Sequence, residues 1–327
     1  MATNVSKRSG EGRRADYRPA GTNGKSSLLA TVKRTVTEFS EDNMTDWAAA
    51  LTYYGLLSLF PALIALVSIV GLVGDPVTTT KTITEMVTKL GPSSAADTFA
   101  GPIKSITSNR GTAGVLFVVG LATALWSASG YVGAFMRAAN VIYETPEGRP
   151  FWKLRPLQIL VTLVMLVLLA MVAMALVLTG PVATAVAGPL GIGSTAVSIW
   201  NIAKWPVLLI VVVTMFAVLF YSAPNVKLAG FKWVTPGAVL AIVVWLVASA
   251  AFAFYVANFG SYDKTYGTLG GLVCLLVWLW LTNIALLLGM ELNSERERSR
   301  ELAAGVPGAD RELQLDARSA PDRQKTT

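Results

Sequence analysis

One cation lies inside a long apolar stretch, and its surroundings are the first place where this chain could do chemistry. Arg137 follows 26 uncharged residues that begin at Gly111. An arginine at the centre of a bilayer costs from about 3 to above 10 kcal/mol, so it reaches the headgroups, pairs within the protein or binds an anion. Asn140 and Tyr143 follow three and six residues later, on the same side of a helix. We therefore predict a polar inner vestibule formed by these three residues.

Pro61 stands in the middle of the first apolar stretch, residues 47–74. Proline has no backbone N–H, so the carbonyl of Leu57 loses its helical partner and a kink is expected. Kinks in membrane helices serve as hinges or are simply packed. Tyr53, Tyr54 and Ser58 place hydroxyl groups on neighbouring turns. These groups either face a polar cavity or satisfy one another across helices.

A polar aromatic cluster lies where the last two apolar stretches meet. Its members are Tyr255, Asn258, Tyr262 and Tyr266. Tyrosine is enriched where membrane helices reach the interface, so these side chains are either helix anchors or an outer gate.

The last apolar stretch ends at polar residues. Glu291 and Asn293 lie there, and Glu291 is either solvated or paired with Arg137 from a neighbouring helix. The mixed charges at residues 295–301 are typical of a solvated helix end. At the start of the same stretch, Gly267 and Gly271 form a GxxxG pair of the kind that lets helices approach, although such pairs are frequent in membrane helices.

Most enzyme chemistry lacks its residues in this chain. There is no His, and Cys274 is the single Cys, so a His-based acid–base site, a zinc site and an internal disulfide are not expected. Gly24, Lys25 and Ser26 resemble the end of a phosphate-binding loop, but Pro19 stands where that loop needs glycine. We therefore expect no enzyme, no cofactor and no metal site.

Six apolar stretches must position the polar residues. The chain of 327 residues is 53% hydrophobic and 14% charged, whereas a soluble domain has about 25% charged residues. A bilayer core about 30 Å thick needs roughly 20 apolar helical residues, since helices and closed barrels alone satisfy every backbone polar group there. The alternating pattern of a barrel is absent. We predict an all-α polytopic membrane protein with six transmembrane helices at residues 47–74, 111–143, 156–180, 203–222, 236–259 and 267–291.

Basic residues indicate the orientation. If Arg137 is counted with the loop after it, 21 of the 27 Lys and Arg residues lie in the two tails and the loops on their side, and 6 lie on the other side. Cytoplasmic loops are enriched in Lys and Arg, so both termini are predicted to be cytoplasmic.

The same pattern divides the chain. Residues 1–46 are predicted to form a basic, mostly disordered cytoplasmic tail with a short helix from about Leu28. Residues 47–293 form the six-helix domain, and residues 294–327 form a charged cytoplasmic tail. Apolar positions near helical spacing in residues 75–110 suggest either an amphipathic helix on the outer surface or an ordinary loop helix.

Several short runs occur in an order typical of one family. They are residues 50–61, 140–143, 149–152, 221–225, 236–238, 255–262, 266–267 and 289–293. As a set, over about residues 47–293, they resemble the YihY/BrkB family of bacterial inner-membrane proteins. The resemblance implies six membrane helices, a link to envelope integrity and virulence, and a role as a transporter. An older family label is ribonuclease, but RNA cleavage needs metal ligands or acid–base groups, and this chain shows neither a His nor an acidic cluster.

The predicted function is transport or export of a small, anionic solute, linked to the cell envelope, along the polar residues named above. A lipid flippase or scramblase and a non-transporting envelope scaffold are the alternatives that the sequence leaves open. Expected partners are membrane lipids and an unidentified small-molecule or lipid substrate, but not nucleic acid, because the positive charge does not gather on one face. A homo-oligomer is compatible with the sequence. The predicted location is the bacterial inner membrane, crossed several times.

Overall fold

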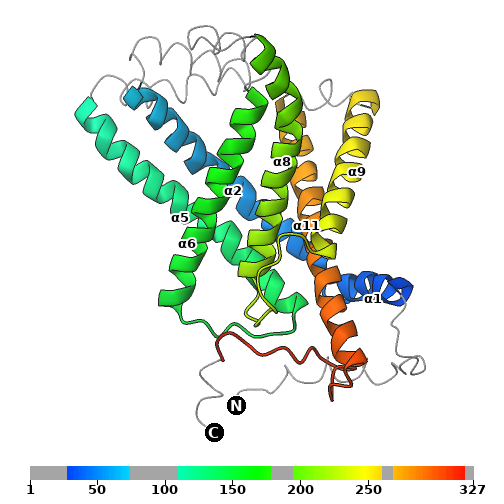
Figure 1. Ribbon diagram of the computed structural model, residues 1–327. Helices are drawn as coiled ribbons and strands as arrows, with labels where there is room; N and C mark the ends of the chain where they lie inside the picture. Colours follow the sequence, from blue (N-terminus) through cyan, green and yellow to red (C-terminus); the bar gives the residue numbers. More distant parts are fainter. Residues whose placement is uncertain (1–27, 74–109, 178–193, 260–267, 321–327) are drawn as a thin grey trace.

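The computed structural model describes residues 28–73, 110–177, 194–259 and 268–320 (Figure 1). These residues are almost entirely helical, and their β-structure is one isolated bridge between Val226 and Ala317. The all-α class is confirmed. The helices are α1 (Leu28–Glu41), α2 (Met44–Val73), α5 (Arg110–Ile142), α6 (Phe151–Val177), α8 (Ser194–Ser222), α9 (Pro236–Phe259) and α11 (Thr268–Ala303).

Four of these helices are long and apolar enough to cross a membrane. In the described part of the chain they are Phe151–Val172, Thr195–Ser222, Pro236–Asn258 and Gly270–Ala303. Two further helices, α2 with 30 residues and α5 with 33, have comparable length. At a rise of about 1.5 Å per residue each of these two is longer than the thickness of a bilayer core. The chain is a multi-pass membrane protein.

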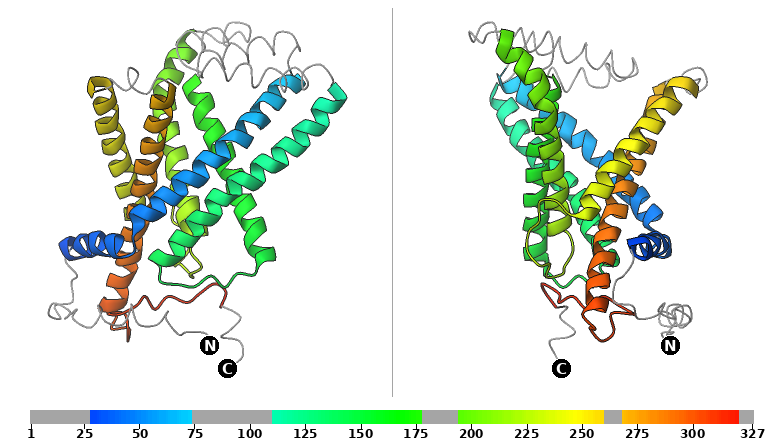
Figure 2. Two further views of the ribbon diagram at one scale, coloured as in Figure 1. Left: turned by 180° about the vertical axis from the view of Figure 1, so that it is seen from behind. Right: turned by 45° about the vertical axis from the view of Figure 1, so that its right-hand side comes forward.

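The long helices run alternately up and down, and α1 lies across one end of them (Figures 1 and 2). We call this end the base; it also holds the end of α11, the loops after α5 and α8, and residues 304–320. In sequence order, α2 packs along α5, α5 contacts α6, α6 contacts α8, and α9 packs along α11. Helix α11 also touches α1, α2 and α5, so it is the central element of the base.

The apolar core is concentrated near the base. Large side chains with less than 2% exposure include Phe135 and Met136 of α5, Leu51 of α2, and Leu287 and Met290 of α11. Many apolar side chains of α6, α8 and α9 are exposed, as Leu160, Ile210 and Val247 illustrate. Exposed apolar positions of this kind suit a lipid environment, and the base is the part where protein packs on protein most closely.

Two glycines bring α9 against α11. A Cβ at Gly289 would lie 2.6 Å from the Cβ of Ala241 and closer still to the carbonyl oxygen of Gly237. Asn293, one turn further along α11, accepts a hydrogen bond from the backbone N–H of Gly237 at 2.9 Å and donates one to Thr235 Oγ1 at 2.9 Å. Gly271, from the pair predicted in the sequence, has open space around its Cβ position.

The boundaries differ from prediction at α8, which begins at Ser194 instead of residue 203, and most of all at the last helix. The span predicted to end at Glu291 continues as α11 to Ala303. The prediction of a solvated helix end at residues 295–301 is wrong for Glu295 and Arg298, which are 1% and 6% exposed. The expected helix from about Leu28 is α1. The expected disorder before residue 28 and the amphipathic helix in residues 75–110 lie outside the described residues, except that Arg110 begins α5.

Candidate functional site: the polar base of the bundle

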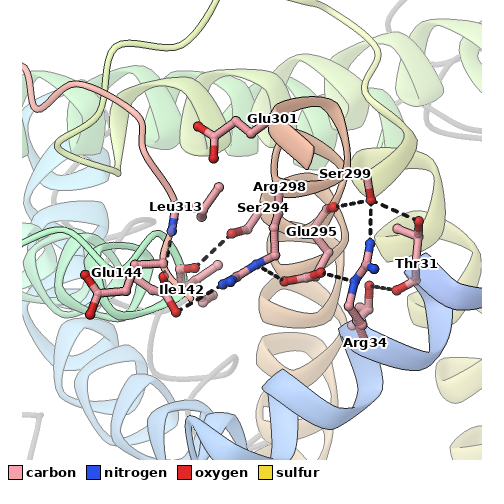
Figure 3. Close-up of polar contacts among 12 residues, drawn as sticks. Thr31, Arg34, Ile142, Glu144, Ser294, Glu295, Arg298, Ser299, Glu301 and Leu313 are labelled. Atoms are coloured by element: carbon pink, nitrogen blue, oxygen red, sulfur yellow. Dashed lines mark hydrogen bonds and ion pairs between the residues drawn. The ribbon is translucent and has the colours of Figure 1, made fainter. Parts of the chain in front are cut away.

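A buried carboxylate, Glu295, is the centre of the first polar network of the base (Figure 3). Its Oε2 accepts a hydrogen bond from Nε of Arg34 in α1 at 2.8 Å, and its Oε1 accepts one from Nε of Arg298 at 2.9 Å. Arg298 continues to Glu144 Oε1 at 3.0 Å. We call Arg34, Glu144, Glu295 and Arg298 the Glu295 network. It joins α1, α11 and the turn that follows α5.

Hydroxyl groups complete this network. Ser299 Oγ accepts a hydrogen bond from Nη2 of Arg34 at 2.6 Å and lies 3.2 Å from Thr31 Oγ1. Ser294 donates to the carbonyl oxygen of Ile142 at 2.9 Å, which ties α11 to the end of α5 (Figure 3). Buried charges are stable only when paired and hydrogen-bonded, and here each charge has both kinds of partner.

Glu144 holds an unusual backbone position. It lies in the turn two residues after the end of α5 with φ 50°, a left-handed conformation that usually belongs to glycine at this place. The backbone N–H of Thr145 donates to the carbonyl of Asn140 at 2.9 Å, which closes the helix end. The Glu144 carboxylate binds Arg298 and also accepts the backbone N–H of Leu313 at 2.8 Å. These contacts explain why a carboxylate occupies a position where glycine would be less strained.

Asn225 is the centre of a second network, which we call the Asn225 clasp. Asn225 is 0% exposed, and its backbone N–H donates to Asn140 Oδ1 at 2.8 Å. Its side-chain amide donates to the carbonyls of Pro146 at 3.0 Å and Ser319 at 2.9 Å. Asn140 in turn donates to Glu147 at 2.9 Å. The clasp therefore holds together the loops after α5 and α8 and the segment after α11.

Two arginines bind the end of α8. Arg149 donates to the carbonyl of Ala223 at 2.9 Å, and Arg318 donates to the carbonyls of Tyr221 and Val226 at 2.6 and 2.8 Å. The last carbonyls of a helix have no partners within it, and they attract cations. These arginines therefore act as side-chain caps of α8.

The base shifts the pKa of two carboxyl groups outside the long helices. Partial burial raises the pKa of Glu147, but the hydrogen bonds and charge of Arg149 outweigh this effect and hold it below its usual range. Burial raises the pKa of Glu38, and the neighbouring carboxylates Glu295 and Asp42 add to the rise while the Arg298 charge opposes it. The fold thus stabilises the ionised form of Glu147 and destabilises the ionised form of Glu38.

Further from the base, a polar chain crosses the helix interfaces. Tyr131 Oη donates to Asn283 Oδ1 at 2.8 Å, and Asn283 Nδ2 donates to Thr52 Oγ1 at 3.1 Å. Thr52 donates to the carbonyl of Ala48 at 2.8 Å. This chain connects α5, α11 and α2, and Tyr131, Asn283 and Thr52 find their partners within the protein.

Of the predicted site residues, Arg137 and Tyr54 come together. The Arg137 guanidinium lies 5.8 Å from the centroid of the Tyr54 ring, and Tyr54 makes an edge contact with Tyr53 at 5.7 Å. Arg137 and Tyr53 are exposed, while Tyr54 is half-buried. The face formed by these three residues joins α2 and α5, and we call it the Arg137 face.

Asn140 and Tyr143 do not join Arg137 in a vestibule. They are 7% and 3% exposed, and Asn140 is used in the Asn225 clasp. Residues three and six positions after Arg137 lie on only approximately the same side of the helix. Here the difference in direction is enough to turn the Asn140 and Tyr143 side chains inward. Met136 and Ala138, the chain neighbours of Arg137, are buried as well.

Glu291 and Asn293 also lie inside the base. Glu291 is 2% exposed, and its Oε2 has no hydrogen-bond partner among the described residues. The described ion pairs do not include the predicted one between Glu291 and Arg137. Asn293 binds the first turn of α9, as described above, so its contacts are structural.

The remaining predicted residues are dispersed. Ser58 donates to the carbonyl of Gly55 at 2.7 Å within α2. Tyr255 and Asn258 are exposed near the far end of α9, where Asn258 donates to the carbonyl of Phe254. Pro61 belongs to α2; its side chain, Tyr262 and Tyr266 lie outside the described part.

Sequence reasoning missed most residues of the two networks. Among the polar residues of the base, Arg149 and Asn225 nevertheless stand in the runs that carried the family resemblance. Those runs were therefore a usable signal for the polar base. Glu295 and Arg298 had no such signal, because a close mixture of charges also describes a solvated helix. Among the described residues, no three His, Cys, Asp or Glu side chains are placed to hold a metal ion.

Comparisons with known proteins agree with this picture. The sequence model of the virulence factor BrkB family matches residues 35–312. A Bacillus subtilis protein, YfkH, whose name describes it as ribonuclease-like, is 31% identical over 255 residues, 78% of this chain and 90% of its own length. A UPF0761 membrane protein of Alteromonas mediterranea is 26% identical over 252 residues, 77% of this chain and 82% of its own.

A shorter match is to a UPF0761 membrane protein of Xanthomonas campestris, 32% identical over 101 residues, 31% of this chain and 23% of its own. No solved structure matches. The BrkB match includes the second half of α1, all the long helices and most residues of both polar networks. The chain belongs to the virulence factor BrkB family of multi-pass inner-membrane proteins, as its resemblance to the YihY/BrkB family implied.

Proposed function

We propose that this protein transports or exports a small anionic solute across the inner membrane, in the service of the cell envelope, and that Arg137 attracts that solute. The observation that carries the proposal is the Arg137 face. Its guanidinium is exposed, and within the described residues no carboxylate lies at ion-pair distance from it. A cation near the membrane that has no carboxylate partner in the protein is available to anions from outside it, whether headgroups or solutes.

A second arginine shows what a structural role requires. Arg155 lies 3.9 Å from the centroid of the Trp126 ring and donates to Gln158 Oε1 at 2.9 Å and to the Trp126 carbonyl at 3.3 Å. Arg137 has one longer aromatic contact instead. The contrast supports a role for Arg137 beyond packing.

Lipid translocation is the second candidate, and one observation favours it. Tyr53 and Leu57, one turn apart on α2, are 59% and 43% exposed. The surface beside Tyr54 therefore continues into an apolar one, and a lipid would place its phosphate at Arg137 and its chains along that surface.

A non-transporting scaffold is favoured instead by the internal pairing of Asn140, Glu144 and Glu295. Ribonuclease activity, or any other enzyme activity, remains disfavoured, because the chain has no His and because the described carboxylates are not placed to hold a metal.

The proposal is tested with strains that differ in this protein. We expect a small anionic metabolite whose ratio inside to outside the cell moves in opposite directions on deletion and on overexpression. Arg137→Gln should abolish that effect while the protein level is unchanged. Lys153→Gln removes an exposed cation at the start of α6 and should have no effect.

Three results contradict the solute proposal. A change confined to the lipids of one leaflet favours lipid movement. No change in either profile favours the scaffold. An effect that survives Arg137→Gln removes Arg137 from the pathway.

The same proposal includes six spans with the base in the cytoplasm. The four candidate spans, α2 and α5 alternate in direction, and most Lys and Arg residues belong to the base side. An alkaline phosphatase fused after Thr327, active only outside the cytoplasm, should be silent, whereas a fusion at residue 90 should be active. Activity of the first fusion would disprove this topology.

A further inference from the structure

Helix α1 has an inverted pattern of burial. Thr31 and Thr35 are 4% and 2% exposed, whereas Leu29, Val32 and Val36 are 80%, 53% and 60% exposed. A helix on the surface of a water-soluble protein buries its apolar face. Here the polar face packs on α11 and the apolar one is left outside.

The orientation of α1 is imposed by the Glu295 network. Arg34 binds Glu295 and Ser299, and Thr31 lies against Ser299, so the polar face is held to α11 by charge and by hydrogen bonds (Figure 3). If α1 rotated so that its apolar residues pointed inward, Arg34 would move away from Glu295. The buried Glu295 charge would then lose one of its partners. The exposure of the apolar residues is therefore part of the fold.

The exposed apolar residues form one stripe. At about 100° per residue, Val32, Val36 and Leu29 fall within about 60° of the helix circumference. Lys33 and Thr37, both exposed, flank the stripe on the side away from α11. This order, an apolar strip bordered by a cation, is the pattern of helices that lie in the plane of a membrane surface.

The position of α1 matches that pattern. It runs across the directions of α2 and α11 in Figure 1 and in the left view of Figure 2. A turn at Asn43, with φ 53°, connects it directly to α2, whose residues from Trp47 to Val73 carry no charge. Helix α1 therefore ends next to the start of the apolar helix α2. Residues 1–27 add six Lys and Arg against two acidic residues, which suits the anionic headgroups of a cytoplasmic leaflet.

We infer that α1 is an interfacial helix whose Leu29, Val32 and Val36 insert into the boundary between headgroups and acyl chains of an anionic leaflet. This inference uses the membrane location and the fold but not the transport proposal. The molecule that covers this stripe of α1 is lipid. A second copy of the chain and the residues before α1 are the competing occupants.

Two neighbouring positions give a matched test. Val36→Cys and Thr37→Cys, each in the full chain, are labelled with a fluorophore in nanodiscs that contain anionic lipid. The native chain, labelled only at Cys274, gives the background to subtract. We expect nitroxide-bearing lipids to quench the label at position 36 at least threefold more than the label at 37, and aqueous iodide to show the reverse order.

Each other outcome overturns the inference. Strong iodide quenching at both positions places the stripe in water. Weak quenching by both reagents at position 36 means that protein covers it, and a crosslinking experiment then distinguishes a second copy from the residues before α1. The two variants differ by one residue on an exposed surface, so their equal thermal stability serves as the check on folding.

Discussion

Replacing Gly289 by alanine is expected to push α9 away from α11 and to destabilise the protein by about 3 kcal/mol or more, at the upper end of what overpacking costs. The new methyl group would meet the backbone of Gly237 and the Cβ of Ala241, and neither can swing aside as a long side chain can. Separation would also break the hydrogen bond from Gly237 to Asn293. Thermal unfolding of the purified protein in detergent measures the loss.

Gly271→Ala is the matched control for this prediction. It makes the same change in the same helix where the new methyl group has open space. Alanine favours a helix over glycine by up to about 1 kcal/mol, so this variant should be as stable as the native protein or slightly more stable. Equal stability of the two variants would show that α9 and α11 do not touch through Gly237 and Gly289.

The second large effect is expected at Glu295. Glu295→Gln keeps the shape of the side chain but removes a charge that two arginines share, and removal of one partner from a buried ion pair costs about 3–5 kcal/mol. The side chains of Glu295 and Arg298 are 1% and 8% exposed, so solvent cannot replace the lost charge. We expect a lower unfolding temperature and release of α1, seen as faster hydrogen exchange in residues 28–41.

Glu297→Gln serves as the comparison. Glu297 lies two residues further along α11 and pairs with Arg300, which is 52% exposed. Exposed pairs of this kind contribute about 1 kcal/mol or less, so the unfolding temperature should change little. If the two variants lose equal stability, the Glu295 network is not buried in solution. A double-mutant cycle of Glu295→Gln with Arg298→Gln would then measure the coupling between Glu295 and Arg298.

Hydropathy predicted the long helices well because a membrane helix must be apolar along its whole length. The predicted fifth span, residues 236–259, coincides with α9. The error at α11 has a physical cause. The charges after Glu291 were interpreted as solvated, but Arg34 and Glu144 neutralise them, so the helix continues into the packed base. Neither partner is near in sequence, and a single sequence does not reveal such pairs.

The candidate site was harder to predict than the fold. Arg137 was identified because a charge inside an apolar stretch is conspicuous. Asn140 and Tyr143 were assigned to the same vestibule by helical spacing, which does not tell whether a face meets another helix or solvent. Asn225 looked like an ordinary loop residue, since its role depends on Asn140 and Ser319, both more than 80 residues away. Long-range partners, rather than local pattern, decide these roles.

The segment after α11 gives the protein a fixed order of assembly during synthesis. Leu313 and Ser319 supply backbone partners to Glu144 and Asn225, and they leave the ribosome only after every helix of the bundle has been made. Until then the turn at the end of α5 keeps its strained backbone with fewer contacts to hold it. The long helices are therefore made before the base acquires these contacts, so the packing of the base is a late step of folding.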